Sequence, residues 1–371
     1  MNDEECIYSI ALPLIPGIGH IGAKRLVDAM GSATKVFKAP QDLAEQLPGI
    51  NPGIAKTLDC PDILARAEHE LEFIKKNRIN CLTLQDEAYP SRLRECEDAP
   101  LALFFKGNAD LNRLHIICMV GTRRATDYGK QFCADFLHDL KSLCPDVLVI
   151  SGLAYGIDIH AHRAALGNQL STVGVLAHGL DRIYPSAHRK TAVDMLNEGG
   201  LLTEFSSGTT PDRYNFVSRN RIVAGMSDAT IVVESADKGG SLITADLANG
   251  YHRDCFAVPG RVSDNTSKGC NELIRDNKAA LIQSADDFVK AMGWVDQTLK
   301  QAEEVQGELF PNLTEEEQKI VKILSAQGDL HINTLVVKAD IPVNRTSALL
   351  FQLEMKGIVK ALVGGVYHLL R

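Results

Sequence analysis

The segment from Asn215 to Ala248 combines residue types that hold a phosphate with an aromatic side chain that can stack on a base. Its first part carries an aromatic residue, two arginines and an amide: Phe216, Arg219, Arg221 and Asn220. An apolar run at 229–233 leads to the turn Gly239-Gly240-Ser241, whose backbone N–H groups can face an anion where a helix starts. This combination suits a phosphate backbone that carries unstacked bases. The segment shows no obvious pairing of nucleophile and base, so it indicates binding rather than cleavage.

Three further turns offer backbone N–H groups at the ends of apolar runs: Val120-Gly121-Thr122-Arg123-Arg124, Ser151-Gly152-x-x-x-Gly156 and His178-Gly179. For any single turn, a tight connection between a strand and a helix is the simpler explanation. Several such turns at one edge of a sheet, joined by paired arginines, favour a phosphate ligand. None has the G-x-G-x-x-G spacing and none is followed by a Walker lysine, so we expect no NAD, no ATP and no other cofactor.

The paired arginines have a second interpretation. Arg123 and Arg124 can fork onto phosphates, but we expect one of them to form a surface ion pair with Asp127 or Asp158. Arg213 precedes the basic helix on an expected loop, where a phosphate contact is easy.

Phe216 also has two interpretations. Stacked on a base it would contribute roughly 1–3 kcal/mol. Alternatively it packs in the core with Val217 and Ile222, since phenylalanine is more often buried than exposed.

The composition is that of an ordinary soluble globular chain with two or three domains. The 371 residues are 45% hydrophobic and 23% charged, and no run approaches the roughly 18 apolar residues of a membrane span. Nine cysteines without a CxxC pair indicate reduced core thiols, and the acidic start lacks the pattern of a signal peptide. We therefore expect a cytoplasmic protein. The net charge of −8 excludes a generally polybasic binder, but acidic residues crowd after Trp294 and leave room for a local basic face.

Residues 79–294 alternate β-type runs with amphipathic stretches. The candidate strands lie at 115–120, 147–151, 172–177, 201–205, 230–235, 255–259 and 279–282, with helical patterns at 129–143, 158–166, 188–197 and 241–251. Continuous apolar strands between helices predict an α/β fold with a Rossmann-like, mostly parallel sheet covered on both faces. Ligands of such sheets bind beyond the carboxyl ends of the strands, where the glycine turns fall.

Residues 1–78 read as short helices between Pro-Gly turns. Gly17-Ile18-Gly19 precedes one helical pattern, and Pro48-Gly49-Ile50 stands in the same relation to a second. The repeat resembles a tandem helix-hairpin-helix, so we expect a helix-hairpin-helix/SAM-like helical domain. Asn51 replaces the second glycine of the second copy, and a packing module that does not touch DNA is an equal alternative.

The C-terminal part begins after an acidic linker at 295–312. Thr314-x-x-Glu317 is a capping box that opens a helix, and two more helical stretches follow. A hairpin turning at Gly364-Gly365 completes a winged-helix-like domain over 313–371. Its third helix carries Arg345 and little other positive charge, so protein contact or packing is favoured over reading a DNA groove.

The order of motifs in the central zone is highly specific. It resembles the DprA/Smf family (DNA-processing protein A) in VGTRRATDYG, SGLAYGIDIHAHRAAL, VLAHGLDRIYPSAH, GGLLTEFSSGTTPDRYNFVSRNRIVAGMSD, KGGSLITADLA and FAVPGRVSDNTSKGCNELI. The resemblance implies a non-enzymatic single-stranded-DNA-binding protein that dimerises. It also implies that the protein protects incoming strands during natural transformation and helps load a RecA-type recombinase.

Carried over position by position, the family's DNA-contact pocket falls on Arg123, Arg213 and Phe216. Arg213 stands where some members have lysine. With the neighbouring turns and helix, the candidate DNA-binding set is Arg123, Arg124, Ser151, Gly152, Gly156, Arg213, Phe216, Arg219, Asn220, Gly239, Gly240 and Ser241. We expect neither catalytic residues nor a metal site nor a membrane contact.

Two enzymatic alternatives compete with this interpretation. The run from Lys238 to Asp246 partly matches the PGGxGTxxE pattern of LOG-like nucleotide phosphoribohydrolases, with Asp246 in place of the catalytic glutamate. A metal-dependent nuclease is suggested only by scattered acids and histidines: Asp158, His160, His162 and Glu204.

Overall fold

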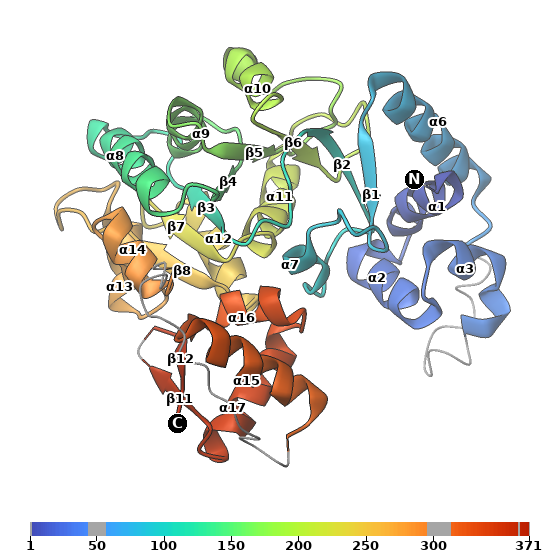
Figure 1. The fold of residues 1–371 in the computed structure, drawn as a ribbon. Coiled ribbons are helices and arrows are strands. Elements are labelled where there is room, and N and C mark those ends of the chain that lie inside the picture. The colour runs from blue at the N-terminus through green and yellow to red at the C-terminus, as the bar shows by residue number, and fades with distance from the viewer. Residues whose placement is uncertain (1, 44–56, 295–312, 363, 371) are drawn as a thin grey trace.

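The computed structural model describes residues 2–43, 57–294, 313–362 and 364–370, and these form three parts (Figure 1). An N-terminal helical part leads into a large sheet with helices on both faces, and a smaller helical module with a short sheet follows. The predicted linker at 295–312 lies outside the described residues. No helix within these ranges is long and apolar enough to cross a membrane.

The central sheet has the Rossmann-like, mostly parallel arrangement that the alternating pattern predicts. Its described strands lie in the order β1-β2-β6-β5-β4-β3-β7-β8-β9; β3 to β9 run parallel, and β1 and β2 add an antiparallel edge. The strands are β1 (Asn80–Thr83), β2 (Ala102–Gly107), β3 (Ile116–Val120), β4 (Leu148–Ser151), β5 (Ser171–Val175), β6 (Gly199–Thr203), β7 (Ala229–Val232), β8 (Asp254–Ala257) and β9 (Ala280–Leu281). All seven predicted strands occur, whereas the sequence pattern does not predict β1 and β2.

Each face of the sheet has its own apolar core. Successive residues of β3 alternate between the faces, with Ile117 and Met119 on one side and Ile116 and Cys118 on the other. The first face is covered by α8 (Asp127–Leu143), α9 (Ile157–Gly167), α10 (Arg189–Met195) and α14 (Ala285–Ala291), and the second by α7 (Ser91–Arg94), α11 (Arg213–Gly225), α12 (Gly240–Gly250) and α13 (Lys268–Arg275). Burial on both faces explains why the strands read as continuous apolar runs.

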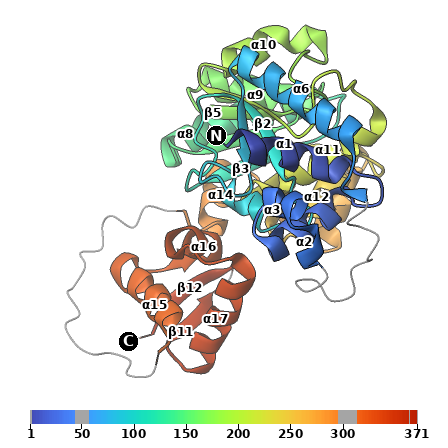
Figure 2. The ribbon, with the colours of Figure 1, turned by 90° about the vertical axis from the view of Figure 1, so that its right-hand side faces the viewer.

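The N-terminal helices cover the β1–β2 edge of the sheet (Figure 2). They are α1 (Asp3–Ala11), α2 (Gly19–Met30), α3 (Ala33–Lys38) and α6 (Pro61–Asn77). Gly17 and Gly19, at φ of 86° and 61°, form the turn before α2 that the first Gly-x-Gly copy predicts. The glycines of the second predicted copy lie in 44–56, outside the described residues.

The C-terminal module has the winged-helix order. It comprises α15 (Glu315–Gln327), β10 (Leu330–His331), α16 (Ile332–Ala339), α17 (Val343–Met355), β11 (Val359–Leu362) and β12 (Val366–Leu369). Thr314 and Glu317 form the predicted capping box, and Gly364 and Gly365 turn the predicted hairpin at positive φ.

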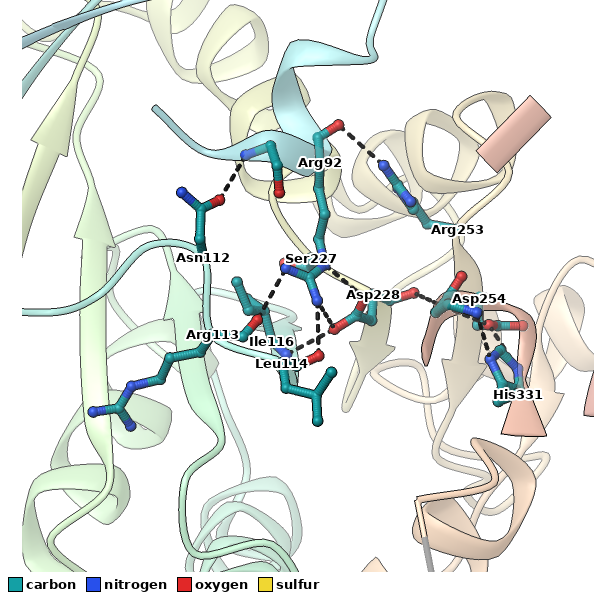
Figure 3. A network of polar contacts seen from close by, with 12 residues as sticks. Arg92, Asn112, Arg113, Leu114, Ile116, Ser227, Asp228, Arg253, Asp254 and His331 are labelled. Carbon is teal, nitrogen blue, oxygen red and sulfur yellow. Dashed lines mark hydrogen bonds and ion pairs between the residues drawn. The ribbon is translucent and has the colours of Figure 1, made fainter. Parts of the chain in front are cut away.

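This module docks against the amino-terminal ends of β7 and β8 (Figure 3). Asn333 donates from its amide nitrogen to the carbonyl oxygen of Asp228 and to a carboxylate oxygen of Asp254, both at 3.2 Å. His331 Nε2 lies 3.3 Å from the Asp254 carboxylate. On the other side of Asp228, the buried Arg92 guanidinium forks onto the carboxylate at 2.6 and 3.0 Å, which satisfies both charges inside the protein.

The start of α17 also faces the core. Burial raises the pKa of the Glu95 carboxyl, while the Arg253 charge and a hydrogen bond from the Val343 backbone oppose the rise. Arg345, on the same helix, pairs with Glu316 at 2.6 Å. Helix-turn-helix proteins read DNA with the first turn of the corresponding helix. In this chain that turn is occupied by contacts within the protein.

The buried imidazole of His162, on α9, predicts how the fold responds to acid. Burial lowers its pKa from 6.5 to about 3, and Nδ1 lies 2.7 Å from Thr172 Oγ1. Between pH 6.5 and about 3 the unfolded chain therefore binds a proton that the folded chain does not. We expect the free energy of unfolding to fall as the pH drops through this window, and to fall less in His162→Gln. Urea titrations at several pH values measure both slopes, and equal slopes would refute the assignment.

Candidate nucleic-acid interface

The strand order reverses between β3 and β7, which is where open α/β sheets bind ligands. The turns after these two strands are joined by Glu234. Its carbonyl oxygen accepts from Thr122 N at 2.7 Å, and its buried carboxylate accepts from Thr126 N at 2.9 Å and Thr126 Oγ1 at 2.5 Å. A Cβ on Gly129 would lie 2.3 Å from this carboxylate, so glycine is required there. The loop carrying Arg123 and Arg124 is thus fixed at both ends.

An aromatic and cationic cluster lies at this carboxyl edge. The Arg123 guanidinium stands over the Phe216 ring with its carbon 4.9 Å from the ring centroid, and the Tyr184 ring centroid lies 6.0 Å from that of Phe216. Phe216 is half-buried, so its ring is neither enclosed in the core nor fully exposed. A guanidinium over a half-buried ring offers a base a stacking surface and its phosphate a charge.

The structure corrects the predicted position of Arg213. It is the first residue of α11 and not part of the preceding loop, because the Asp212 side chain caps the helix by accepting from Asn215 N at 2.8 Å. Arg213 is exposed, and the neighbouring Tyr214 is 81% exposed. The start of α11 therefore presents both a charge and a ring to solvent.

Arg219 is buried, so it does not present a free charge to a ligand as the sequence suggests. Its Nη1 donates to the Val175 carbonyl oxygen at 2.6 Å, and the position of a Cβ on Gly152 would lie 2.1 Å from Nη1 and 2.4 Å from an Asp158 oxygen. Burial raises the pKa of Asp158, and the Arg219 charge opposes the rise. The buried Arg219 thus helps to hold the carboxyl ends of the strands in place, and the half-buried Asn220 follows it on α11.

The remaining predicted glycine and serine positions shape the edge. Gly156 has φ of 80°, and a Cβ there would lie 2.0 Å from the Thr122 carbonyl oxygen. The buried Ser151 donates to the Met119 carbonyl oxygen at 2.6 Å. Ser241 is also buried and donates to Ser235 Oγ at 2.9 Å, and a Cβ on Gly239 would lie 2.2 Å from the same oxygen. Gly240 is exposed at the start of α12.

The exposed cations on the segments that follow the carboxyl ends of parallel strands include these six: Arg123, Arg124, Arg213, Lys238, Arg261 and Lys268. None forms an ion pair with a carboxylate in the part of the chain that the structure describes. The expected ion pair of Arg123 or Arg124 with Asp127 or Asp158 is not formed, because Asp127 pairs with Lys130 at 2.9 Å. The Arg123 charge acts on the buried Asp158 only by opposing the rise of its pKa. The candidate set from the sequence did not include the three cations at 238, 261 and 268, although each lies directly beside a glycine: Gly239, Gly260 and Gly269.

Sequence reasoning also missed three tyrosines. Tyr155, Tyr184 and Tyr214 are 50%, 47% and 81% exposed. The Tyr155 ring meets the ring of His188 edge-on at 4.8 Å. Tyr155 precedes Gly156, Tyr184 precedes Pro185, and Tyr214 follows Arg213 in the first turn of α11. That local context was the available signal.

Comparisons with known proteins identify the family. A family model described as DNA recombination-mediator protein A matches residues 80–293, more than half of the chain. The chain belongs to that family. A second model, the DprA winged helix domain, matches residues 308–365.

The chain is similar to curated proteins and to solved structures of this family. The putative DNA processing protein DprA of Mycobacterium tuberculosis is 34% identical over 80% of this chain and 78% of its own length. The crystal structure of DprA from Streptococcus pneumoniae is 29% identical, with a TM-score of 0.62 over 78% of this chain and 98% of that one. DNA processing protein A from Helicobacter pylori, whose solved structure concerns its unique single-stranded DNA binding mode, is 29% identical with a TM-score of 0.52 over 58% and 96%.

Within this family fold, the residues of the enzymatic alternatives are engaged elsewhere. Asp246 lies on the exposed side of α12, about 9 Å along the helix from its first residue, and pairs with Lys278 at 2.8 Å. Glu204 pairs with Arg221, and His162 faces Thr172. Across the described ranges, no three His, Cys, Asp or Glu side chains gather as metal ligands.

A substitution at Gly152 tests how tightly the buried Arg219 guanidinium packs beneath the carboxyl ends of the strands. We expect Gly152→Ala to cost about 1–3 kcal/mol of unfolding free energy, because its Cβ would overlap the buried Arg219 guanidinium. Gly250→Ala is the matched control, since a Cβ there meets open space and should change stability by less than about 1 kcal/mol. Denaturant titrations compare the two variants. Equal stability would show that the guanidinium has room to move.

Proposed function

We propose that this protein binds single-stranded DNA along the carboxyl edge of its central sheet. The observation that carries the proposal is the stack of Arg123 over Phe216, with Tyr184 beside it. Unstacked bases bind aromatic rings without regard to sequence, and the backbone follows positive charge. The six unpaired cations supply that charge in a chain whose net charge is −8. The described binding mode of the Helicobacter pylori relative supports the same ligand.

The proposed DNA-binding residues divide into contacts and supports. Arg123, Arg124, Arg213 and Phe216 contact the strand. Gly240 presents its backbone N–H group at the start of α12, whereas the Gly239 N–H donates to the Ala236 carbonyl oxygen at 3.1 Å, so Gly239 shapes the turn. Ser151, Gly152, Gly156, Arg219, Asn220 and Ser241 position these contacts, because they are buried or half-buried beneath the turns.

We further propose that the protein is a non-enzymatic mediator that acts in the cytoplasm during natural transformation. It protects incoming single strands and helps a RecA-type recombinase to load on them. Membership of a family described as recombination mediators supports this role. A homodimer would place two such DNA-binding edges on one DNA strand. The last β-strand of the sheet, β9, carries the exposed Leu281 and offers surface for a second copy of the chain.

The cluster predicts the effect of three substitutions on oligonucleotide affinity. Phe216→Ala should weaken binding by roughly 5- to 150-fold, the equivalent of about 1–3 kcal/mol of stacking. Arg123→Ala and Arg213→Ala should weaken binding and each reduce the slope of log affinity against log salt by about 0.7. Fluorescence anisotropy with labelled single strands measures both quantities.

Arg345→Ala is the control for these variants, because it removes a cation that already pairs with Glu316 on the winged-helix module. It should leave affinity and slope unchanged. Unaltered binding in all three test variants would remove the site assignment.

The mediator role predicts a gain of recombinase activity. On single strands coated with a single-strand-binding protein, ATP hydrolysis by a RecA-type recombinase should start with a shorter lag when this protein is added. Phe216→Ala should restore most of the lag because the mediator no longer holds the strand. If wild type leaves the lag unchanged while still binding DNA, the protein binds strands without mediating.

A further inference from the structure

A groove of about 710 Å³ lies between α6 of the N-terminal part and the loop that follows β6. Arg66, His69 and Phe73 line it from α6; Asp181, Ser207, Gly208 and Thr209 line it from the sheet side. Residues three and four apart share one face of a helix, so the three α6 side chains form a continuous wall. The volume falls within the usual range of small-ligand sites, about 300–1,000 Å³.

The groove is held in shape by a buried carboxylate. Glu70 is almost completely buried and accepts from Ser207 N at 2.8 Å and from Ser207 Oγ at 2.6 Å. Arg66 donates to the Ser207 carbonyl oxygen and lies 3.4 Å from Glu70, yet its side chain is 40% exposed. The guanidinium therefore has donors left that face the groove.

The anion on the opposite wall is already neutralised. Asp181 accepts from Gly208 N at 3.0 Å and pairs with Arg182 at 2.8 Å. Phe73 is half-buried and His69 is exposed, so the wall offers two rings beside one cation. A ring surface next to a guanidinium, with backbone amide and carbonyl groups opposite, matches the chemistry of a nucleotide.

Two short segments connect the groove to the aromatic cluster. Asp181 lies three residues before Tyr184, and Thr209 lies four residues before Arg213, a span of at most about 14 Å. Gly179 N donates to the Thr209 carbonyl oxygen at 3.4 Å, which joins the two segments. A DNA strand that leaves the aromatic cluster over Tyr184 or Arg213 therefore reaches the groove within a few nucleotides.

We propose that this groove is a second nucleotide-binding site for the same single strand, so that α6 of the N-terminal part extends the DNA track. Arg66 takes a phosphate, and the rings of His69 and Phe73 take the base. The inference rests on the proposed function, since it names where the strand continues after the aromatic cluster.

The test compares labelled oligothymidylates of about 6 and about 16 nucleotides on the full-length protein, within the usual range of site sizes. Arg66→Ala should weaken binding of the long strand about five- to tenfold and lower its salt slope by about 0.7. It should leave the short strand unaffected, because the aromatic cluster alone holds it. Lys76→Ala is the matched control: it removes one cation from an exposed position of the same helix outside the groove, and should change neither.

A second variant avoids the loop contacts of Arg66. His69→Glu leaves Glu70 and Ser207 untouched, puts a negative charge in the groove and should weaken only the long strand. Equal losses on both strands, or losses matched by Lys76→Ala, would overturn the groove assignment. If wild type binds neither strand, the proposed function itself fails; if it binds both and the groove variants change nothing, only the extension to α6 fails.

Discussion

The Arg219 guanidinium lies beneath the carboxyl ends of β4 and β5, where it donates to the Val175 carbonyl oxygen and faces Asp158 across Gly152. A buried cation is costly unless charge and hydrogen bonds compensate it. Here the Val175 carbonyl oxygen, at the end of β5, and the Asp158 carboxylate, in the first turn of α9, compensate the charge. Helix α11 therefore cannot move without disturbing both contacts. Because α11 also carries Arg213 and Phe216, the buried contacts of Arg219 fix the positions of these two residues as well.

The distribution of charge follows a simple division. Cations that serve structure are paired: Arg92 with Asp228, Arg221 with Glu204, and Arg253 with Glu95. The six exposed cations Arg123, Arg124, Arg213, Lys238, Arg261 and Lys268 have no such carboxylate in the described ranges. A chain of net charge −8 can therefore attract a polyanion, because the field at the edge is set by nearby charges within a Debye length of about 8–10 Å.

Much of the fold follows from local pattern. Continuous apolar runs locate β3 to β9, the Gly17 and Gly19 turn locates the start of α2, and Thr314 with Glu317 locates the start of α15. The pattern does not predict β1, of four residues, or β2, of six, because only the four-residue α7 separates them and no alternation of strand and helix marks the pair. Their antiparallel pairing joins positions some twenty residues apart.

The sequence predicts which residue types form the site, but not which of these residues are exposed and which support the fold. Arg213 and Arg219 belong to one helix and look alike in the sequence, yet the first is exposed and the second is buried. Which of them faces the sheet depends on how α11 packs, a tertiary property. Tyr184 joins Phe216 across 32 residues of sequence only because the loops after β5 and β6 meet at one edge.

The polar contacts of Asn333 and His331 attach the winged-helix module to the beginnings of β7 and β8, while the cationic edge is formed at their ends. The parallel strands thus give the sheet two distinct ends, and each end has its own set of contacts. A partner that binds the module from outside therefore meets the opposite end of the sheet from the cationic edge. Strand direction alone keeps these two surfaces apart.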